Sequence, residues 1–260
     1  MSSSELERED RLRQMTPARV ALGRVGHAPP LAAVLAFQLA HSEARDAVWH
    51  APDWGALERS LRALDLEPLR VHSRAPDRAQ YLLRPDAGRR LEARSKAELE
   101  ALPAQSADVA LLLADGLSAA ALEQHAPGVL GHLLPALERR GLTVAPPVLA
   151  AQARVALGDE VGELLGARAV VVLIGERPGL SSPHSLGLYL THAPRVGRLD
   201  SERNCISNVH EGGLGYGEAV AVLLDLLEGA RALGRSGVDL KPSSGLRLEG
   251  GREGGSRVGG

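Results

Sequence analysis

The stretch Ala169-Val-Val-Val-Leu-Ile174 is the clearest apolar run of the chain, and it leads directly into the polar turn Gly175-Glu-Arg-Pro-Gly179. A strand with one solvated face alternates apolar and polar side chains, whereas a strand buried on both faces is apolar throughout. Strands of the second kind are typical of parallel sheets that helices cover on both sides. The stretch therefore predicts an α/β fold, with the polar turn at the carboxyl end of a buried strand.

Two further strands of the same kind precede this one. Asp108–Ala114 is a nearly continuous apolar run, and Pro147–Ala151 is a weaker one. Helical stretches separate the three strands, at Ala119–Arg140 and at Glu160–Leu165, and Asp159 is the expected N-cap of the second helix. Strands that alternate with helices predict a parallel-sheet, Rossmann-like domain.

The flanking segments complete this domain. From Leu186 to Thr191, leucine alternates with glycine, tyrosine and threonine, which predicts a strand with two unlike faces. Tyr216–Leu233 is strongly apolar and predicts a closing helix. On the N-terminal side, Leu69–Val71 is a short strand candidate, and the Arg-rich stretch Ala79–Arg94 is expected to be helical.

The chain before Pro68 has a different pattern. Apolar residues recur at helical spacing in Leu31–Val48 and Trp54–Leu64, and Thr16-Pro17 resembles a helix start with proline at the first helical position. This part of the chain is therefore expected to be helical, without strands before residue 60.

These patterns predict three parts. Residues 1–66 form a small helical N-terminal region, and residues 67–242 form the α/β domain. Residues 243–260 are rich in glycine, serine, arginine and glutamate, cannot bury a core, and are expected to be disordered and dispensable.

Composition excludes several classes of function. The 260-residue chain has a formal net charge of −2, whereas a nucleic-acid partner calls for a basic patch or stripe. The one cysteine, Cys205, rules out an internal disulfide and a Cys-rich zinc site, and it fits a reducing, cytoplasmic compartment. No histidines have the spacing of metal ligands, so no metal site is expected. The apolar runs are too short to cross a membrane.

Ligands of open parallel α/β sheets bind at the carboxyl ends of the strands. Polar or glycine residues stand at these ends here, namely Asp115, Ser118, Gly158, Asp159, Glu176, Arg177, Ser181 and Ser182. The loop 175–185 is unusually polar, and its N–H groups are able to bind a phosphate or an amide. Each candidate also has a plain structural interpretation. The loop could be a well-packed connection, Asp115 and Ser118 could cap the next helix, and Cys205 could be a small buried hydrophobic residue.

Familiar catalytic motifs are missing from the sequence. It has no Gly-x-Gly-x-x-Gly after a strand, no Walker-A loop and no Gly-x-Ser-x-Gly elbow. No pair of carboxylates with an acid/base relation is recognisable either. The residues alone thus predict an α/β domain with a binding loop and assign no catalytic residue.

A set of motifs in consistent order, from Thr16 to Leu227, resembles one family, the small subunit (light chain) of ethanolamine ammonia-lyase. The motifs are Thr16-Pro-Ala-Arg-Val-Ala-Leu-Gly-Arg24, Gln38-Leu-Ala-His41, Ala44-Arg-Asp-Ala-Val48, Ala75-Pro-Asp-Arg78, Arg84-Pro-Asp86, Gly88-Arg-Arg-Leu91, Ala114-Asp-Gly-Leu-Ser118, Arg154-Val-Ala-Leu-Gly-Asp-Glu160, Gly175-Glu-Arg-Pro-Gly-Leu-Ser-Ser-Pro183, Ser185-Leu-Gly187 and Arg203-Asn-Cys-Ile-Ser-Asn208. The chain departs from the family pattern at His184 and in Val209–Gly213.

The resemblance implies a function. Members of this family act with a large barrel subunit and adenosylcobalamin to convert ethanolamine to acetaldehyde and ammonia, in a hetero-oligomer of paired heterodimers. The large subunit holds the substrate and most catalytic groups, and the small subunit helps to bind the cobalamin. Val155, Glu176 and Cys205 match the family's small-subunit cobalamin contacts. The signature Asp-x-His-x-x-Gly is missing, so no histidine is placed to replace the cofactor's own base.

Two hypotheses from different classes follow. The chain is either a subunit of a cobalamin-dependent lyase, active only with its large subunit, or a stand-alone α/β ligand-binding or regulatory module without catalytic activity. The sequence does not distinguish a protein free in the cytoplasm from one packaged in a bacterial microcompartment.

Overall fold

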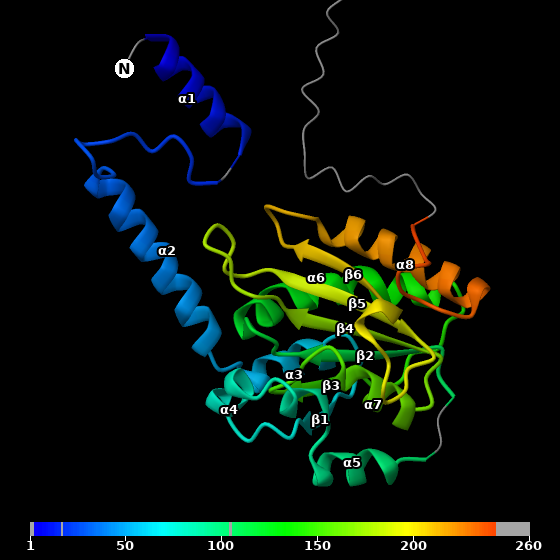
Figure 1. Cartoon of the computed structure of the whole chain (residues 1–260). Coiled ribbons are helices and arrows are strands. Elements are labelled where there is room, and N and C mark those ends of the chain that lie inside the picture. Colours follow the sequence, from blue (N-terminus) through cyan, green and yellow to red (C-terminus); the bar gives the residue numbers. More distant parts are fainter. Residues whose placement is uncertain (1–2, 17, 104–105, 243–260) are drawn as a thin grey trace, which may run out of the picture.

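A six-stranded sheet with strand order β1-β3-β2-β4-β5-β6 forms the centre of the protein in the computed structural model, which describes residues 3–16, 18–103 and 106–242 (Figure 1). The strands are Leu69–His72 (β1), Val109–Ala114 (β2), Val148–Ala151 (β3), Ala169–Gly175 (β4), Leu186–His192 (β5) and Arg203–Val209 (β6). Strands β1 to β4 are parallel, whereas β5 and β6 are antiparallel to their neighbours. The apolar stretch that predicted the fold is β4, and every residue of this strand is buried.

The α/β class is therefore confirmed, with a sheet that is mostly parallel. Dinucleotide-binding Rossmann domains have the strand order 3-2-1-4-5-6. The order found here is different, and the Rossmann-like part of the prediction is not confirmed. Strand β6 was not predicted.

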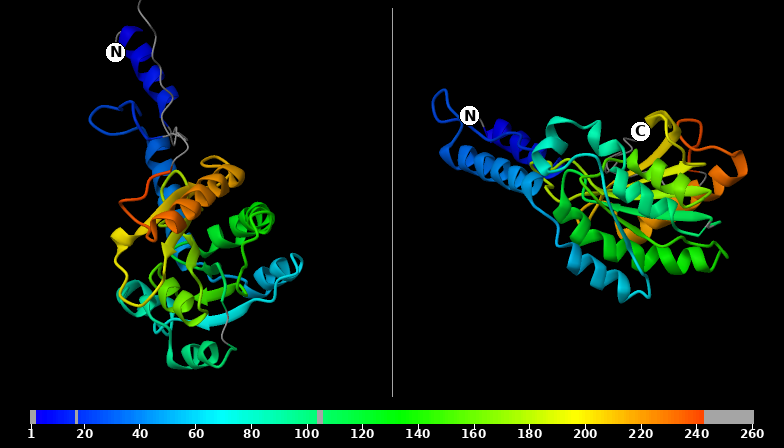
Figure 2. Two further views of the ribbon diagram at one scale, coloured as in Figure 1. Left: turned by 90° about the vertical axis from the view of Figure 1, so that its right-hand side faces the viewer. Right: turned by 90° about the horizontal axis from the view of Figure 1, so that it is seen from below.

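Helices cover the two faces of the sheet unequally (Figure 2). On one face, α3 (Trp54–Arg62), α6 (Ala119–Glu138) and α8 (Tyr216–Leu233) bury a core that extends from β2 across to β6. On the other face, α5 (Ala93–Glu100) and α7 (Leu157–Leu164) contact β1, β2 and β4. The buried core on that side contains no residue of β5 or β6 among the described residues. One face of β5 and β6 is consequently left without a covering helix.

The predicted helix Ala79–Arg94 is wrong as a single element. The structure has α4 (Arg78–Leu83) and the short 3-10 helix η1 (Ala87–Arg89) in its place, followed by α5. The break falls at Arg84-Pro85, where the proline ring disfavours helical backbone at the preceding residue. Arg84 accordingly has φ −124° and ψ 73°.

The N-terminal region is helical, as predicted. It contains α1 (Ser3–Met15), α2 (Leu31–Trp49) and α3, and no strand precedes β1 in the described part of this region. The helix expected from Thr16 is wrong, because no helix occurs in residues 18–30. The Thr16 hydroxyl instead accepts a hydrogen bond from the Ala18 N–H, and Gly23 and Gly26 follow with φ of +77° and +63°, which breaks helical geometry.

Helices α1 and α2 extend away from the α/β body, whereas α3 packs on it (Figures 1 and 2). Leu57 and Leu61 of α3 belong to the same core as β2 and β4. The boundary between residues 66 and 67 stays a prediction, and the tail 243–260 lies outside the described residues. No helix of the described part is long and apolar enough to cross a membrane.

Candidate functional site

The ends of β2 and β4 and the uncovered face of β5 and β6 together form a depression. One part has a volume of about 420 Å³ and includes Glu176 and Asn208, and a neighbouring part of about 310 Å³ includes Cys205. Both parts share Arg154, Val155 and Tyr189. We call the two parts together the sheet hollow, lined by Tyr81, Arg89, Gly116, Leu117, Arg154, Val155, Ala156, Ile174, Gly175, Glu176, Arg177, Tyr189, Asp200, Arg203, Cys205, Ser207 and Asn208.

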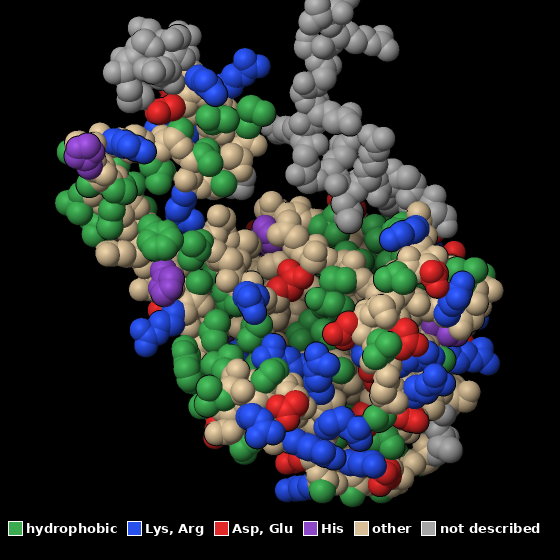
Figure 3. Space-filling view, in the orientation of Figure 1, with side chains coloured by type: hydrophobic (Ala, Val, Ile, Leu, Met, Phe, Trp, Pro, Cys, Tyr) green, Lys and Arg blue, Asp and Glu red, His purple; other side chains and the backbone are tan. Residues whose placement is uncertain are grey.

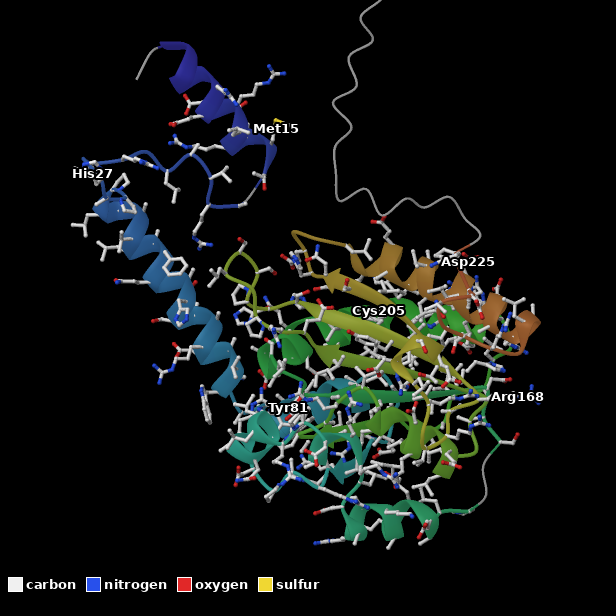
Figure 4. The ribbon with its side chains drawn as sticks, in the orientation of Figure 1. Met15, His27, Tyr81, Arg168, Cys205 and Asp225 are labelled. Carbon is white, nitrogen blue, oxygen red and sulfur yellow. The ribbon has the colours of Figure 1, made fainter. Side chains whose placement is uncertain are left out.

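The three residues predicted as cofactor contacts all line this hollow. Val155 precedes α7, Glu176 follows β4, and Cys205 lies on β6, next to Tyr189 of β5. Residues from separate parts of the sequence thus meet at one place in the fold. Figure 4 labels Cys205 and Tyr81; Tyr81 lies in α4 and also lines the hollow.

Two glycines bring the ends of β2 and β4 together at one side of the hollow. Gly116 has φ +57°, and a Cβ atom at this position would lie 2.2 Å from the Gly175 carbonyl oxygen. A Cβ atom at Gly175 would lie 1.9 Å from the Ser118 carbonyl oxygen. Side chains are therefore excluded at both positions, and the Leu117 N–H donates to the Gly175 carbonyl at 2.9 Å.

Neither Asp115 nor Ser118 caps α6, so the capping interpretation is wrong. The Asp115 carboxylate accepts hydrogen bonds from the N–H groups of Gln152 (2.9 Å) and Ala153 (3.0 Å). Burial raises the pKa of Asp115. Ser118 occupies the N-cap position, but its hydroxyl donates to the Pro183 carbonyl at 3.1 Å. Both side chains fix loops around the hollow, and both are buried.

The wall that carries Val155 rests on a stacked pair. The guanidinium carbon of Arg154 lies 4.3 Å from the centre of the Tyr81 ring. The Tyr81 hydroxyl donates to the Ala153 carbonyl at 3.0 Å, and burial raises the pKa of this phenol. Together with the hydrogen bonds that Asp115 accepts from Gln152 and Ala153, these contacts hold residues 152–155 in place.

One of the two carboxylate oxygens of Glu176 is hydrogen-bonded to other residues of the chain. Its Oε2 accepts hydrogen bonds from the Ser185 hydroxyl (2.6 Å) and the Asn208 N–H (3.1 Å), and its own N–H donates to the Ser185 carbonyl. Within the described part of the chain, Oε1 accepts no hydrogen bond. A Cβ atom at Gly187 would lie 3.0 Å from this Oε1 and 3.0 Å from the Tyr189 ring. The absence of a side chain at Gly187 leaves Oε1 available as an acceptor beside the ring.

Cys205 is exposed in the hollow, so the interpretation as a buried hydrophobic residue is wrong. Cys205 pairs with Tyr189 across the two strands. Desolvation by the walls of the hollow, with a smaller effect of the Glu176 charge, raises the pKa of the thiol and outweighs interaction with the Tyr189 side chain, which lowers it. Cys205 is thus a neutral thiol at neutral pH, unlike the thiolates that act as nucleophiles or metal ligands.

Asp159 does not cap α7, contrary to the prediction. The helix begins at Leu157 with Ala156 in the N-cap position, and Asp159 is instead buried in a salt bridge with Arg203 of β6. The adjacent Glu160 accepts two hydrogen bonds from Arg90, at 3.0 and 3.1 Å. The start of α7 is therefore held by Arg203 of β6 and by Arg90, which precedes α5 in the sequence.

Residues of the loop after Glu176 line two different depressions. Arg177 lines the sheet hollow, whereas Ser181 and Ser182 line a separate depression together with His125, His184 and His210. The His125 ring nitrogens contact the Tyr216 hydroxyl (2.9 Å) and the His184 carbonyl (3.1 Å). No three histidine, cysteine, aspartate or glutamate side chains among the described residues are grouped so that they could hold a metal ion.

Sequence reasoning missed Tyr81, Arg154, Gly187 and Tyr189 as parts of the site. A signal for the last two was present. The alternation in β5 places Gly187 and Tyr189 on the face opposite the buried leucines, and this is the face that the hollow exposes. Tyr81 and Arg154 carry no such signal, because they meet only in the folded chain.

Comparison with known proteins agrees with this picture. The model of the family described as ethanolamine ammonia-lyase light chain matches residues 6–241. Curated relatives named ethanolamine ammonia-lyase small subunit include one from Xanthomonas campestris pv. campestris (strain B100), 53% identical over 89% of this chain and 86% of the relative. Another, from Azotobacter vinelandii, is 52% identical over 92% of this chain and 90% of the relative. The chain therefore belongs to the ethanolamine ammonia-lyase light-chain family.

Proposed function

We propose that the chain is the small subunit of an adenosylcobalamin-dependent ethanolamine ammonia-lyase, and that the sheet hollow is its share of the cofactor site. One observation carries the proposal. Val155, Glu176 and Cys205, which the family resemblance marks as cobalamin contacts, are separated in sequence and meet in one hollow.

Cobalamin contains a flat ring with amide groups around its rim. The hollow fits a ligand of this kind. Gly187 contributes no side chain to the uncovered sheet face, and Tyr189 and Val155 offer apolar surface. Glu176 keeps Oε1 as an acceptor for an amide N–H. Cys205 is a neutral thiol that packs against the ligand, and among the described residues no histidine lines the hollow.

The roles of this chain are to bind and orient the cofactor. The Glu176 carboxylate accepts a hydrogen bond from a cofactor amide, and the pair formed by Arg154 and Tyr81 supports the wall at Val155. Adenosylcobalamin supplies radical chemistry when it is bound. In this proposal the large subunit holds ethanolamine, and the complex releases acetaldehyde and ammonia. No residue of this chain is assigned a catalytic role.

The hollow is open, so a second protein surface is needed to enclose a ligand as large as cobalamin. We infer a hetero-oligomer of paired heterodimers, located in the cytoplasm or in a bacterial microcompartment. The lone cysteine suits such a reducing compartment.

Reconstitution tests the proposal. The full chain, the large subunit from the same organism and adenosylcobalamin are mixed, and acetaldehyde formation from ethanolamine is measured. Activity is expected with all three components and not when either subunit is omitted, and the chain alone should bind cobalamin weakly. Absence of turnover in the full mixture, with tight binding of another ligand by the isolated chain, would support the stand-alone module instead.

A further inference from the structure

The N-terminal half of α2 is an apolar arm without charge. The arm, residues 31–42, contains no Asp, Glu, Lys or Arg. Three leucines and a phenylalanine on it are strongly exposed, Leu31 by 71%, Leu35 by 54%, Phe37 by 46% and Leu39 by 62%. Figure 3 shows hydrophobic side chains gathered over this helix, where it stands away from the α/β body.

Such a surface does not suit a helix in water. Isolated exposed leucines are common in soluble proteins, but a contiguous exposed patch marks an interaction site. Gln38, His41 and Ser42 are the only polar residues of the arm, and a helix with so much apolar surface is normally buried. Of the whole of α2, only Ala40 and Ala47 are buried in this chain. The arm is therefore built to be enclosed by another surface.

Hydrogen bonds attach the segments on either side of the arm to the border of the sheet hollow. At the end of α2, Arg78 donates from Nε to the Val48 carbonyl and from Nη1 to the Gly116 carbonyl, both at 2.7 Å, and Gly116 lines the hollow. Before α2, Arg19 donates to the Leu180 carbonyl at 3.1 Å, in the loop that follows Glu176. The arm therefore projects from the border of the hollow, on the segment between these two attachments, where a protein that closes the hollow can reach it.

We infer that the arm is the docking element for the large subunit and inserts into an uncharged, apolar groove on it. This inference rests on the proposed function as a subunit. A charged groove would lose its hydration against residues 31–42 without gaining an ion pair, which disfavours it. Closure of the hollow and burial of the arm would then belong to one continuous interface with one partner.

The test compares two double variants with a matched control. Leu35→Glu/Leu39→Glu places charges in the arm, and Leu35→Ala/Leu39→Ala shortens the same side chains while favouring the helix. Leu233→Glu changes a leucine that is also 54% exposed, at the far end of α8 from the arm. The affinity of each full-length chain for the large subunit is measured, together with its melting curve.

The glutamate variant should bind the large subunit at least about 100-fold more weakly and the alanine variant about tenfold more weakly, because leucine burial is lost. The control should stay within about threefold of the unaltered chain, and all melting curves should coincide. Unchanged binding of both double variants would overturn the inference, as would loss of self-association with large-subunit binding intact, which would identify a second copy as the occupant.

Different outcomes of these measurements contradict the inference about the arm and the proposed function. Once assembled at saturating subunit concentrations, the arm variants should bind adenosylcobalamin as the unaltered complex does. If the unaltered chain does not bind the large subunit at all, the proposed function is wrong, and this inference falls with it. If it binds and the double variants bind equally well, only the inference about the arm is wrong.

Discussion

Asp159 and Arg203 form a buried bidentate salt bridge that joins the two walls of the sheet hollow. The oxygens of Asp159 lie 2.5 and 2.7 Å from the Arg203 Nη1 and Nη2 atoms, and each side chain is 3% exposed. Burial disfavours the charge of Arg203, but the bonds to Asp159 outweigh it and raise the pKa of Arg203. Because Asp159 lies in α7, after Val155, and Arg203 lies in β6, before Cys205, the pair fixes these two walls relative to each other.

Loss of one partner of this bridge should strongly destabilise the chain. Asp159→Asn leaves the Arg203 charge buried with a weaker partner, and a cost of about 3–5 kcal/mol in the free energy of unfolding is expected. Denaturant titration measures it. Glu228→Gln is the control, because its bond to Arg140 is at the surface and should contribute less than about 1 kcal/mol. Equal costs for the two variants would show that the buried bridge is not structurally important.

Glu176→Gln should weaken cofactor binding more than it weakens the fold. The glutamine oxygen can accept the bonds from Ser185 and Asn208, while its NH₂ group replaces the free Oε1 and cannot accept. Cofactor affinity of the reconstituted complex should fall by about tenfold or somewhat more, with a smaller change in rate at saturating cofactor.

Ser185→Ala is the matched control for Glu176. It removes a donor to Oε2 without changing Oε1, and it should cost about 1 kcal/mol of stability with little effect on cofactor affinity. A lower melting temperature for Glu176→Gln with unchanged cofactor affinity would mean that Glu176 only stabilises its own loop.

A methyl group at Gly187 should fill part of the hollow. The added Cβ would lie 3.0 Å from both Glu176 Oε1 and the Tyr189 ring, so these groups must shift. Gly187→Ala is expected to lower the cofactor affinity of the complex by about tenfold. At Gly215 an added Cβ meets nothing within 4 Å, so Gly215→Ala should leave the affinity unchanged. Cofactor titration of both variants checks the prediction, and equal affinities would contradict it.

Cys205 should react slowly with alkylating agents at neutral pH. Because its pKa is raised, the thiolate fraction is smaller than that of a free cysteine, whose pKa is about 8.5. The rate of iodoacetamide labelling, followed by mass spectrometry, should keep rising as the pH is raised above about 8.5. Tyr189→Phe removes the hydroxyl, whose interaction lowers the pKa of the thiol, and should slow labelling further. Rapid labelling at pH 7 would contradict the neutral thiol.

Asp108 should contribute stability that disappears in acid. Hydrogen bonds from the Thr143 N–H and hydroxyl, both 3.0 Å, lower the pKa of its carboxyl in the folded chain. A lowered folded pKa means that the contribution is complete above the unfolded value of about 3.9 and is lost as pH falls through the folded pKa. Asp108→Asn should cost about 1 kcal/mol at pH 7, and the difference should shrink below about pH 4. Urea titrations across this pH range test the trend.

Local sequence patterns were enough to predict the elements whose burial is regular along the chain. The apolar run Ala169–Ile174 is a fully buried strand, and the closing helix has the predicted bounds Tyr216–Leu233. Glu176 was predicted as a ligand contact from its place after that strand, and the structure places it in the lining of the hollow. In these cases the neighbouring residues alone carry the signal, because burial of a whole strand or of a helix face leaves a regular apolar pattern.

Strand β6 and the sheet hollow depended on the tertiary structure. Residues Arg203–Val209 mix asparagine, serine and arginine with apolar residues, and they form a strand because they pair with β5 and because Arg203 meets Asp159. The alternation in β5 predicted two unlike faces, but it carries no information on strand direction. The hollow exists because α7 covers β2 and β4 and leaves β5 and β6 open. The position of a helix relative to distant strands is a property of the packed chain, so no stretch of sequence displays it.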